Sequence, residues 1–182
     1  TKLSCHIQSL SYLLSYSHLL LNSALLHYHS PLSFGVSLHN YPLSLTLSHT
    51  KLSCHILGIN LGDFGYKTKE NFYQLINKLE ELDGISRFRI SSIEPDLLSE
   101  EIIEFVNSSN KFVPHFHIPL QSGSNLLLKK MRRRYDTDLY SSRIKLIKEL
   151  MPHACIGVDV IVGFPGETEE EFNKTIDYIK SL

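Results

Sequence analysis

The chain has 182 residues, with 18 lysines and arginines against 19 acidic residues and a formal net charge of −1. This length is sufficient for one domain with its own core, and the near-neutral charge excludes a global electrostatic attraction to nucleic acid or to membranes. The three cysteines, Cys5, Cys54 and Cys155, show neither CxxC nor CxxxCxxC spacing, so they offer no set of thiolates for zinc or an iron–sulfur cluster.

Residues 1–56 differ in composition from the remainder. Up to residue 57 the sequence contains only two charged residues, Lys2 and Lys51, and is dominated by Leu, Ser, His and Tyr. The heptapeptide TKLSCHI occurs at 1–7 and again at 50–56, but its surroundings do not match as they would in a stacked repeat. We therefore interpret 1–56 as a low-complexity segment, unstructured or artefactual, and the missing initial Met suggests a fragment.

Other interpretations of this segment are weaker. The Leu-rich stretch 9–26 faintly resembles a signal peptide, but Ser, His and Asn interrupt its apolar run. The same interruptions argue against a membrane span, which needs about 20 mostly apolar residues. Six histidines between His6 and His49 lack a regular ligand spacing for a metal. A Cys5–Cys54 disulfide is possible but not favoured.

Beyond residue 56 the pattern alternates between short apolar runs and amphipathic segments, which predicts βα units. Strands are expected at 56–61, 88–93, 115–118 and 155–162, with helices opening near Thr68, Ser99, Ser122 or Ser124, Thr137 and Thr168. Apolar rather than alternating strands are typical of a parallel sheet covered by helices. The predicted division is therefore 1–56 and a folded region 57–182, of class α/β.

Right-handed crossovers place the carboxyl ends of such strands on one rim, which is where α/β proteins bind their ligands. We predict the functional site at this rim. Its polar members are Asn60, Asp63, Glu94, Gln121, Ser122, Ser124 and the loop 163–167, with Asp159 inside the last strand.

The stretch PHFHIPLQSGSNLLLKKMRRRY, residues 114–135, is the most informative single motif. It describes a buried strand that ends in a Gly- and Ser-containing loop and continues into a basic helix. Gly123 lets the backbone approach a ligand, and arginines 132–134 are suited to a carboxylate or phosphate. An ordinary strand–loop–helix corner would explain the same letters.

Taken together, the rim motifs resemble the radical S-adenosylmethionine (SAM) methylthiotransferases of tRNA, most closely the branch that acts on threonylcarbamoyladenosine. The resemblance covers about residues 57–182. The matching pieces are GINLGDFG at 58–65, RISSIEP at 89–95, HFHIPLQSGS at 115–124, MRRRY at 131–135 and GVDVIVGFPGET at 157–168.

This resemblance implies a partial TIM-like radical SAM barrel, with about four of its six βα units in this chain. It implies SAM and a [4Fe-4S] cluster as cofactors, tRNA as partner, no membrane or DNA partner, and a cytoplasmic location. Family members bind the cluster through a CxxxCxxC loop after the first strand, which this sequence lacks. Cys54 lies ahead of the second strand and is not assigned as a ligand. We therefore assign no catalytic or metal residue and expect the chain alone to be inactive.

The same resemblance implies a cradle for SAM on the rim. Asn60 would lie near the methionine end, Glu94 and Gln121 near the ribose or amino group, and Arg133 opposite the carboxylate. The backbone at Gly163 would approach the adenine. The complete set assigned to the cofactor is Asn60, Glu94, Gln121, Ser122, Arg133, Asp159 and Gly163.

Plain structural roles compete with some of these assignments. Arg133 would also suit a solvated basic helix face. Asp159 interrupts an apolar strand and needs a partner, either the ligand or a polar group of a neighbouring strand. His115 and His117 point to the same side of their strand, and a core or substrate-lining role is favoured over a metal pair because no further ligands are evident.

Two different functional classes stay open at this point. Another (βα) enzyme would share the rim and bind a phosphate at the helix start near Thr168. Alternatively, the chain is a non-catalytic remnant or a gene-model artefact.

Overall fold

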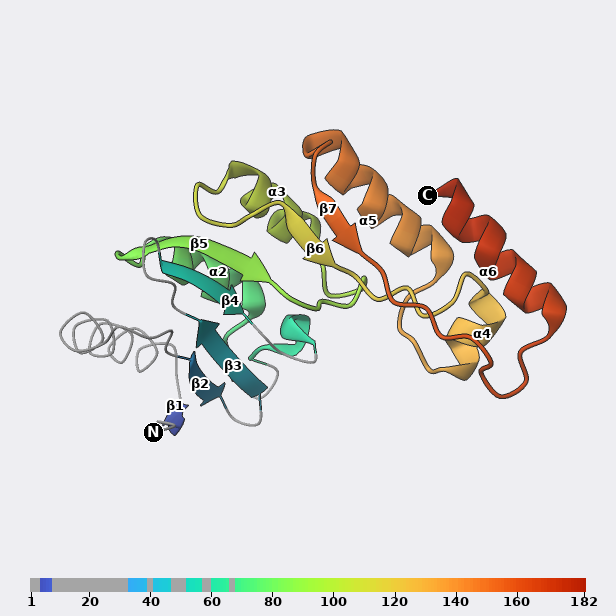
Figure 1. Cartoon of the computed structure of the whole chain (residues 1–182), viewed down its shortest axis with the longest axis horizontal. Coiled ribbons are helices and arrows are strands. Elements are labelled where there is room, and N and C mark those ends of the chain that lie inside the picture. The colour runs from blue at the N-terminus through green and yellow to red at the C-terminus, as the bar shows by residue number, and fades with distance from the viewer. Residues whose placement is uncertain (1–3, 8–32, 39–40, 47–51, 57–59, 66–67) are drawn as a thin grey trace. The chain divides into compact units, whose positions relative to one another are not determined.

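The computed structural model describes residues 4–7, 33–38, 41–46, 52–56, 60–65 and 68–182 (Figure 1). The chain divides into two compact units, Thr1–Ser91 with Ser109–Val113 and Ser92–Ser108 with Pro114–Leu182. The described elements are β1 (Ser4–Ile7), β2 (Ser33–Leu38), β3 (Tyr41–Thr46), β4 (Leu52–Ile56), η1 (Leu61–Asp63), α2 (Phe72–Glu80), β5 (Ile85–Ile90), α3 (Glu100–Ser108), β6 (His115–His117), α4 (Asn125–Lys130), α5 (Thr137–Leu150), β7 (Cys155–Gly157) and α6 (Glu169–Ser181).

The first unit contains two groups of paired strands. Strands β1, β2 and β3 form one sheet, with β1 parallel and β3 antiparallel to β2. Strand β4 pairs in parallel with β5, as a βα connection requires, and Phe88 of β5 forms a parallel bridge with Phe112. The sequence did not predict β1 to β3, and the predicted first strand at 56–61 was placed too late, because β4 ends at Ile56.

Helix α2 covers the apolar side of β5. Phe72, Leu75, Ile76 and Leu79 recur at helical spacing and are all buried. The expected N-cap at Thr68 was wrong. Asn71 caps the helix instead, because its side chain accepts from the Gln74 N–H while the Gln74 side chain accepts from the Asn71 N–H, forming a capping box.

Lys111 fastens the carboxyl end of α2. Its ammonium donates to the carbonyls of Glu80 and Leu82, each at 2.6 Å. The Glu80 carboxylate in turn accepts from the Ser109 hydroxyl at 2.6 Å. These bonds satisfy helix-end carbonyls that have no partner within the helix and complete the core of the first unit.

The second unit is built on the parallel pair β6 and β7. Phe116 of β6 is fully buried, and pairing continues past both strands through a bridge between Gln121 and Val160. Ser92 forms a further parallel bridge with His117. The second unit is therefore α/β with parallel pairing, as predicted.

Helices α3, α4, α5 and α6 of this unit agree with the sequence prediction. Ser124 caps α4, Asp136 caps α5 and Thr168 caps α6, each by accepting a backbone N–H of the first turn. Buried side chains pack the unit from every helix: Ile102, Ile103, Val106, Leu127, Leu128, Tyr140, Ile144, Ile147 and Thr175.

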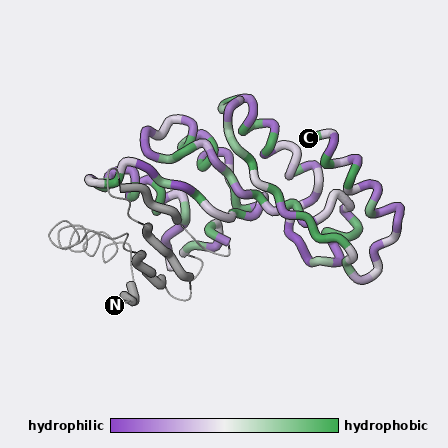
Figure 2. Tube along the Cα trace, in the orientation of Figure 1, coloured by the Kyte–Doolittle hydropathy of each residue, from purple (hydrophilic) through white to green (hydrophobic). Residues whose placement is uncertain are grey.

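The predicted last strand, 155–162, is shorter in the structure. Regular pairing stops at Gly157, and beyond it only Val160 forms a bridge among the described residues. The apolar run that follows β7 is visible as a green stretch in Figure 2, yet Val162 is 66% exposed. The apolar composition was therefore a poor guide to burial at this strand.

The predicted boundary between residues 56 and 57 coincides with neither unit boundary, and the different origin of the two parts stays a prediction. None of the helices in the described part of the chain combines the length and the apolarity that a membrane crossing requires.

The contact of Gly123 with α6 gives a direct test of how the second unit packs. A Cβ at position 123 would lie 2.7 Å from the Cα of Thr175 and 2.8 Å from the Cβ of Tyr178. We expect Gly123→Ala to lower the free energy of unfolding by about 1–3 kcal/mol, because the backbone of α6 must shift. Urea unfolding followed by circular dichroism measures this. Gly157→Ala is the control, since its Cβ would meet the His117 ring at an ordinary 3.5 Å, and an equal loss in both variants would contradict the packing described.

Candidate functional site

The loop after β6 leaves the strand through an unusual backbone conformation. Gln121 has φ 67°, in the left-handed region that non-glycine residues rarely occupy. Its N–H donates to the Asp159 carbonyl at 2.8 Å and its carbonyl accepts from Ile161 at 2.9 Å. The strand pairing therefore fixes Gln121 despite its strained backbone, a combination that is common at functional sites.

Tyr135 holds the start of the same loop through hydrogen bonds to its backbone. Its buried hydroxyl donates to the carbonyls of Pro119 and Leu120, at 2.9 and 3.2 Å. Burial raises the pKa of this phenol to about 12, and the nearby Arg133 opposes part of that shift. Tyr135 is therefore a neutral donor that holds the loop at physiological pH.

The loop is also fastened to α6. Thr175, buried in the middle of that helix, accepts from the Gly123 N–H at 3.1 Å, and its hydroxyl lies 3.2 Å from that of Ser122. The Ser122 hydroxyl also accepts from the Ser124 N–H. Ser122 is fully buried and turned toward these partners, so the structure gives it a role in shaping the loop, while its assignment to the cofactor stays a prediction.

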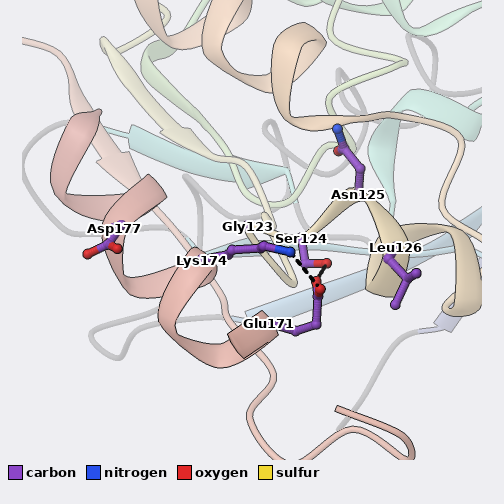
Figure 3. A pocket seen from close by; sticks show the side chains of 7 residues that line it. All are labelled: Gly123, Ser124, Asn125, Leu126, Glu171, Lys174 and Asp177. Carbon is purple, nitrogen blue, oxygen red and sulfur yellow. Dashed lines mark hydrogen bonds and ion pairs between the residues drawn. The ribbon is translucent and has the colours of Figure 1, made fainter. Parts of the chain in front are cut away.

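A hollow of about 550 Å³ lies beside this loop, between α4 and α6 (Figure 3). Glu171 accepts from the Ser124 hydroxyl and pairs with Lys174 at 2.9 Å. The hydrogen bond from Ser124, followed by that from Lys174, holds the pKa of Glu171 below its usual range. Each charged residue that lines the hollow has an ion-pair partner, Lys174 for Glu171 and Lys180 for Asp177, so the hollow is not the best candidate site. Its lining residues are Gly123, Ser124, Asn125, Leu126, Glu171, Lys174 and Asp177.

An ion-pair cluster forms around Glu94, two residues after the Ser92 that bridges to His117. Glu94 accepts from Arg133 at 2.7 Å and from Arg134 at 3.4 Å, and Arg134 also pairs with Asp96 at 3.1 Å. The Glu94 side chain is 18% exposed and that of Arg133 is 27% exposed. Arg133 therefore does not lie on a solvated helix face: it closes on Glu94, another residue of the predicted site.

The Nε atom of Arg133 is buried and has no hydrogen-bond partner among the described residues. A buried guanidinium N–H without a partner costs free energy, so it marks a position where a hydrogen-bond acceptor would be stabilised.

Asp159 finds its partner on the neighbouring strand. Its carboxylate lies 2.9 Å from Nε2 of His117, across the β6–β7 pair. One of the two alternatives raised by the sequence, a polar group of an adjacent strand, is thus realised. The same contact explains His117 without a metal, and no group of three potential metal ligands occurs in the described part of the chain.

A glutamate side chain links the two ends of the loop after Val162. Gly163 has φ 78°, which favours glycine, and its N–H donates to the Glu167 carboxylate at 2.5 Å. Among the described residues, and apart from its two chain neighbours, no atom lies within 4 Å of the position that a Cβ on Gly163 would occupy. Glycine here satisfies the backbone conformation and leaves the loop surface free for a ligand. The sequence analysis did not assign a role to Glu167.

Asn60 belongs to the first unit. Its amide donates to the Asp63 carboxylate at 2.9 Å, immediately before and within η1. The other predicted site residues, Glu94, Gln121, Ser122, Arg133, Asp159 and Gly163, all belong to the second unit. The structure therefore brings six of the predicted residues into one compact unit and describes Asn60 separately.

Comparison with known proteins shows the superfamily of this chain. The model of the radical SAM superfamily matches residues 59–179, which is more than half of the chain. The chain belongs to the radical SAM superfamily. The region matched begins just before Asn60 and ends within α6, so every predicted site residue of this radical SAM chain lies inside it.

Curated relatives support the narrower resemblance to the tRNA methylthiotransferases. Threonylcarbamoyladenosine tRNA methylthiotransferase MtaB of Bacillus subtilis is 46% identical over 127 residues, which are 69% of this chain and 28% of that protein. The tRNA-2-methylthio-N(6)-dimethylallyladenosine synthases of Pelotomaculum thermopropionicum and Clostridium tetani are 42% and 40% identical over 129 residues. The radical SAM chain spans less than a third of the length of these relatives.

The residues described do not fit a [4Fe-4S] cluster. The sequence has three cysteines, none within a CxxxCxxC spacing, and Cys155 is a free, exposed thiol. Three clustered thiolates are what such a site requires. We therefore derive no chemical step through a cluster held by these residues.

The second unit does fit part of a SAM site. Glu94 and Arg133 supply both signs of charge that a zwitterion needs, and the buried Nε of Arg133 lacks an acceptor in the described part of the chain. Within the described part of the chain, the space around the Cβ position of Gly163 leaves the backbone there accessible.

Thr175 and Glu171 are site-shaping residues that the sequence analysis missed. A usable signal existed for Thr175, since Phe172 precedes it by three residues and Tyr178 and Ile179 follow it by three and four, on the same face of the helix. Only the fold shows that its partners lie about fifty residues earlier in the chain, in the loop at Ser122 and Gly123.

The bonds of Thr175 predict a specific loss on mutation. Thr175→Val keeps the size of the side chain but leaves the Gly123 N–H without its acceptor, so we expect the free energy of unfolding to fall by about 1–3 kcal/mol. Thr175→Ser, which keeps the hydroxyl, should lose clearly less. Denaturant unfolding of the two variants measures the difference, and a loss in Thr175→Ser as large as that in Thr175→Val would contradict the role of the hydroxyl.

The raised pKa of Tyr135 predicts that the free energy of unfolding falls at alkaline pH. Its pKa is raised in the folded state, so its contribution is fully present below the ordinary value near 10 and is lost as pH rises toward about 12. We expect the free energy of unfolding to fall between pH 10 and 12 in the wild type, and to fall less steeply in Tyr135→Phe. Urea unfolding at a series of pH values measures this, and identical slopes would contradict the assignment.

Proposed function

We propose that this chain is the central part of a radical SAM methylthiotransferase that modifies threonylcarbamoyladenosine, or a related modified adenosine, in tRNA. The observation that carries the proposal is the Glu94–Arg133 pair at 2.7 Å, inside the region matched by the radical SAM model, with the buried Nε of Arg133 left without a partner among the residues that the structure describes. The 46% identity to MtaB of Bacillus subtilis supports the choice of substrate.

In this proposal the residues of the chain bind and orient SAM. Arg133 would use its free Nε to donate to the methionine carboxylate, and Glu94 would accept from the amino group or the ribose. Gln121, fixed by strand pairing, and the open backbone at Gly163 would line the ribose and adenine. Asp159, paired with His117, would complete the polar lining within the second unit.

We further propose that the βα units form part of a (βα)6 barrel. The parallel pairs β4–β5 and β6–β7, with the bridge between Ser92 and His117, support this arrangement. A cytoplasmic location follows from the proposed tRNA substrate.

The chain alone is proposed to be inactive. In an intact enzyme, a cluster held by residues outside this chain would supply, together with SAM, the radical chemistry for methylthiolation of the adenine ring. The residues present here contribute binding and exclusion of water, and the cluster thiolates would have to come from elsewhere.

Binding of SAM tests the cradle. We expect the chain to bind radiolabelled SAM in equilibrium dialysis, and Glu94→Gln to weaken that binding at least about tenfold, since one charge of the pair is lost. Glu100→Gln is the matched control, because Glu100 pairs with Arg143 but is 68% exposed and is not part of the predicted site. Equal affinities of all three proteins would overturn the assignment of Glu94.

Analysis of iron and sulfide tests the proposed inactivity. After anaerobic reconstitution we expect no stoichiometric cluster on the purified chain and no cleavage of SAM to 5′-deoxyadenosine. A bound cluster with turnover would refute this part of the proposal. Retained SAM binding without a cluster would fit either a part of a larger enzyme or a non-catalytic remnant, and addition of a chain that carries the CxxxCxxC segment would distinguish the two by restoring cleavage.

A further inference from the structure

The end of α4 and the turn after it contain more basic side chains than are paired with carboxylates among the described residues. Five cations occur between residues 129 and 134, namely Lys129, Lys130, Arg132, Arg133 and Arg134. Arg133 and Arg134 are matched by Glu94 and Asp96. Lys129 and Arg132 are exposed and have no carboxylate partner in the described part of the chain, while Lys130 donates to a carbonyl.

Arg132 occupies a position where glycine is favoured. It has φ 57°, its N–H donates to the Lys129 carbonyl at 3.0 Å, and the N–H of Arg133 donates to the Leu128 carbonyl at 2.9 Å. These two bonds form a Schellman motif with Arg132 as the left-handed residue that closes α4. A residue with a Cβ is strained in this conformation, and the exposed side chain forms no bond within the described residues that would offset the strain.

The helix dipole of α4 accounts for only part of the positive charge formed by Lys129, Lys130 and Arg132, which we call the basic patch. Lys129 and Lys130 lie in the last turn of α4, where positive charge interacts favourably with the helix dipole. Arg132 lies past the helix end, and the nearest acidic residue along the chain, Asp136, already accepts a hydrogen bond as the cap of α5. Strained backbone at an exposed residue without a structural role is an observation that points to function.

The patch borders the predicted cofactor rim. Lys130 donates through Nζ to the Gly166 carbonyl at 3.2 Å, in the loop that begins at Gly163. Arg132 directly precedes Arg133, whose guanidinium pairs with Glu94. A polyanion held at this turn would therefore lie next to the residues proposed to hold SAM.

We propose that Lys129, Lys130 and Arg132 form a surface that contacts the phosphate backbone of the RNA substrate. This inference rests on the proposed function, because it names the part of the chain that the tRNA would touch. Several unmatched cations on one turn are suited to successive phosphates, and arginine binds phosphate bidentately. The contact is independent of RNA sequence and would position the substrate rather than select it.

Binding of an unmodified tRNA transcript to the full chain tests the proposal. We expect Lys129→Gln, Lys130→Gln and Arg132→Gln together to lower affinity at least about tenfold and to reduce the slope of log K against log salt by about two. Lys145→Gln is the control, since Lys145 is exposed but pairs with Glu149, and its effect should be below about twofold. SAM binding, measured on the same proteins, should not change.

Substitutions at Arg132 alone distinguish the effect of its charge on tRNA binding from the effect of its strained backbone on stability. Arg132→Gly should raise the melting temperature by about 2–4 °C by relieving the left-handed backbone, while it weakens tRNA binding. Arg132→Gln should weaken tRNA binding equally without the gain in melting temperature, and Arg132→Lys should restore most of the binding.

The outcomes distinguish this inference from the proposed function. If the wild type binds SAM and the variants bind tRNA as tightly as the wild type, the RNA surface is refuted and the SAM proposal stands. If the wild type fails to bind SAM, the proposed function fails by itself. Equal binding of polyglutamate and tRNA, with equal sensitivity to the triple variant, would indicate an acidic protein partner and overturn the RNA assignment.

Discussion

The backbone pairing between the segments 115–121 and 155–161 is the constraint on which the candidate site depends. It begins as the regular β6–β7 ladder and continues through the bridge of Gln121 with Val160. Because the strands are parallel, their carboxyl ends leave the sheet on the same side. That geometry sets Gln121 against Asp159 and brings both chain segments to the point where their loops start. The hydroxyl of Tyr135 and the hydroxyl of Thr175 then fix the first of these loops.

Much of the second unit follows from the sequence alone. The helices from Glu100, Thr137 and Thr168 onward were predicted because capping residues precede amphipathic runs, and both signals are local. The N-cap of α2 was misplaced because Thr68 and Asn71 are both good caps, and only the reciprocal bond of Gln74 decides between them. Strand limits were less predictable, since an apolar run such as 155–162 does not reveal which of its residues find a partner.

The sequence named candidate residues for the site but not the contacts between them. Sequence motifs selected Glu94, Arg133 and Asp159, yet gave no indication that Glu94 and Arg133 pair with each other or that Asp159 pairs with His117. These pairs join residues about forty positions apart, so they depend on the fold. Thr175 was overlooked for the same reason, because a single polar residue on a helix face carries no information about which loop lies against it.

The close approach of Gly123 to α6 has a dynamic consequence. With Thr175 and Tyr178 occupying the space where any side chain would lie, the loop and the last helix have no room to slide past each other. The two segments must separate or stay together as one body. The loop at Gly123 can therefore open only if α6 undocks. The rigidity of this loop depends on the packing of α6, which follows it much later in the chain.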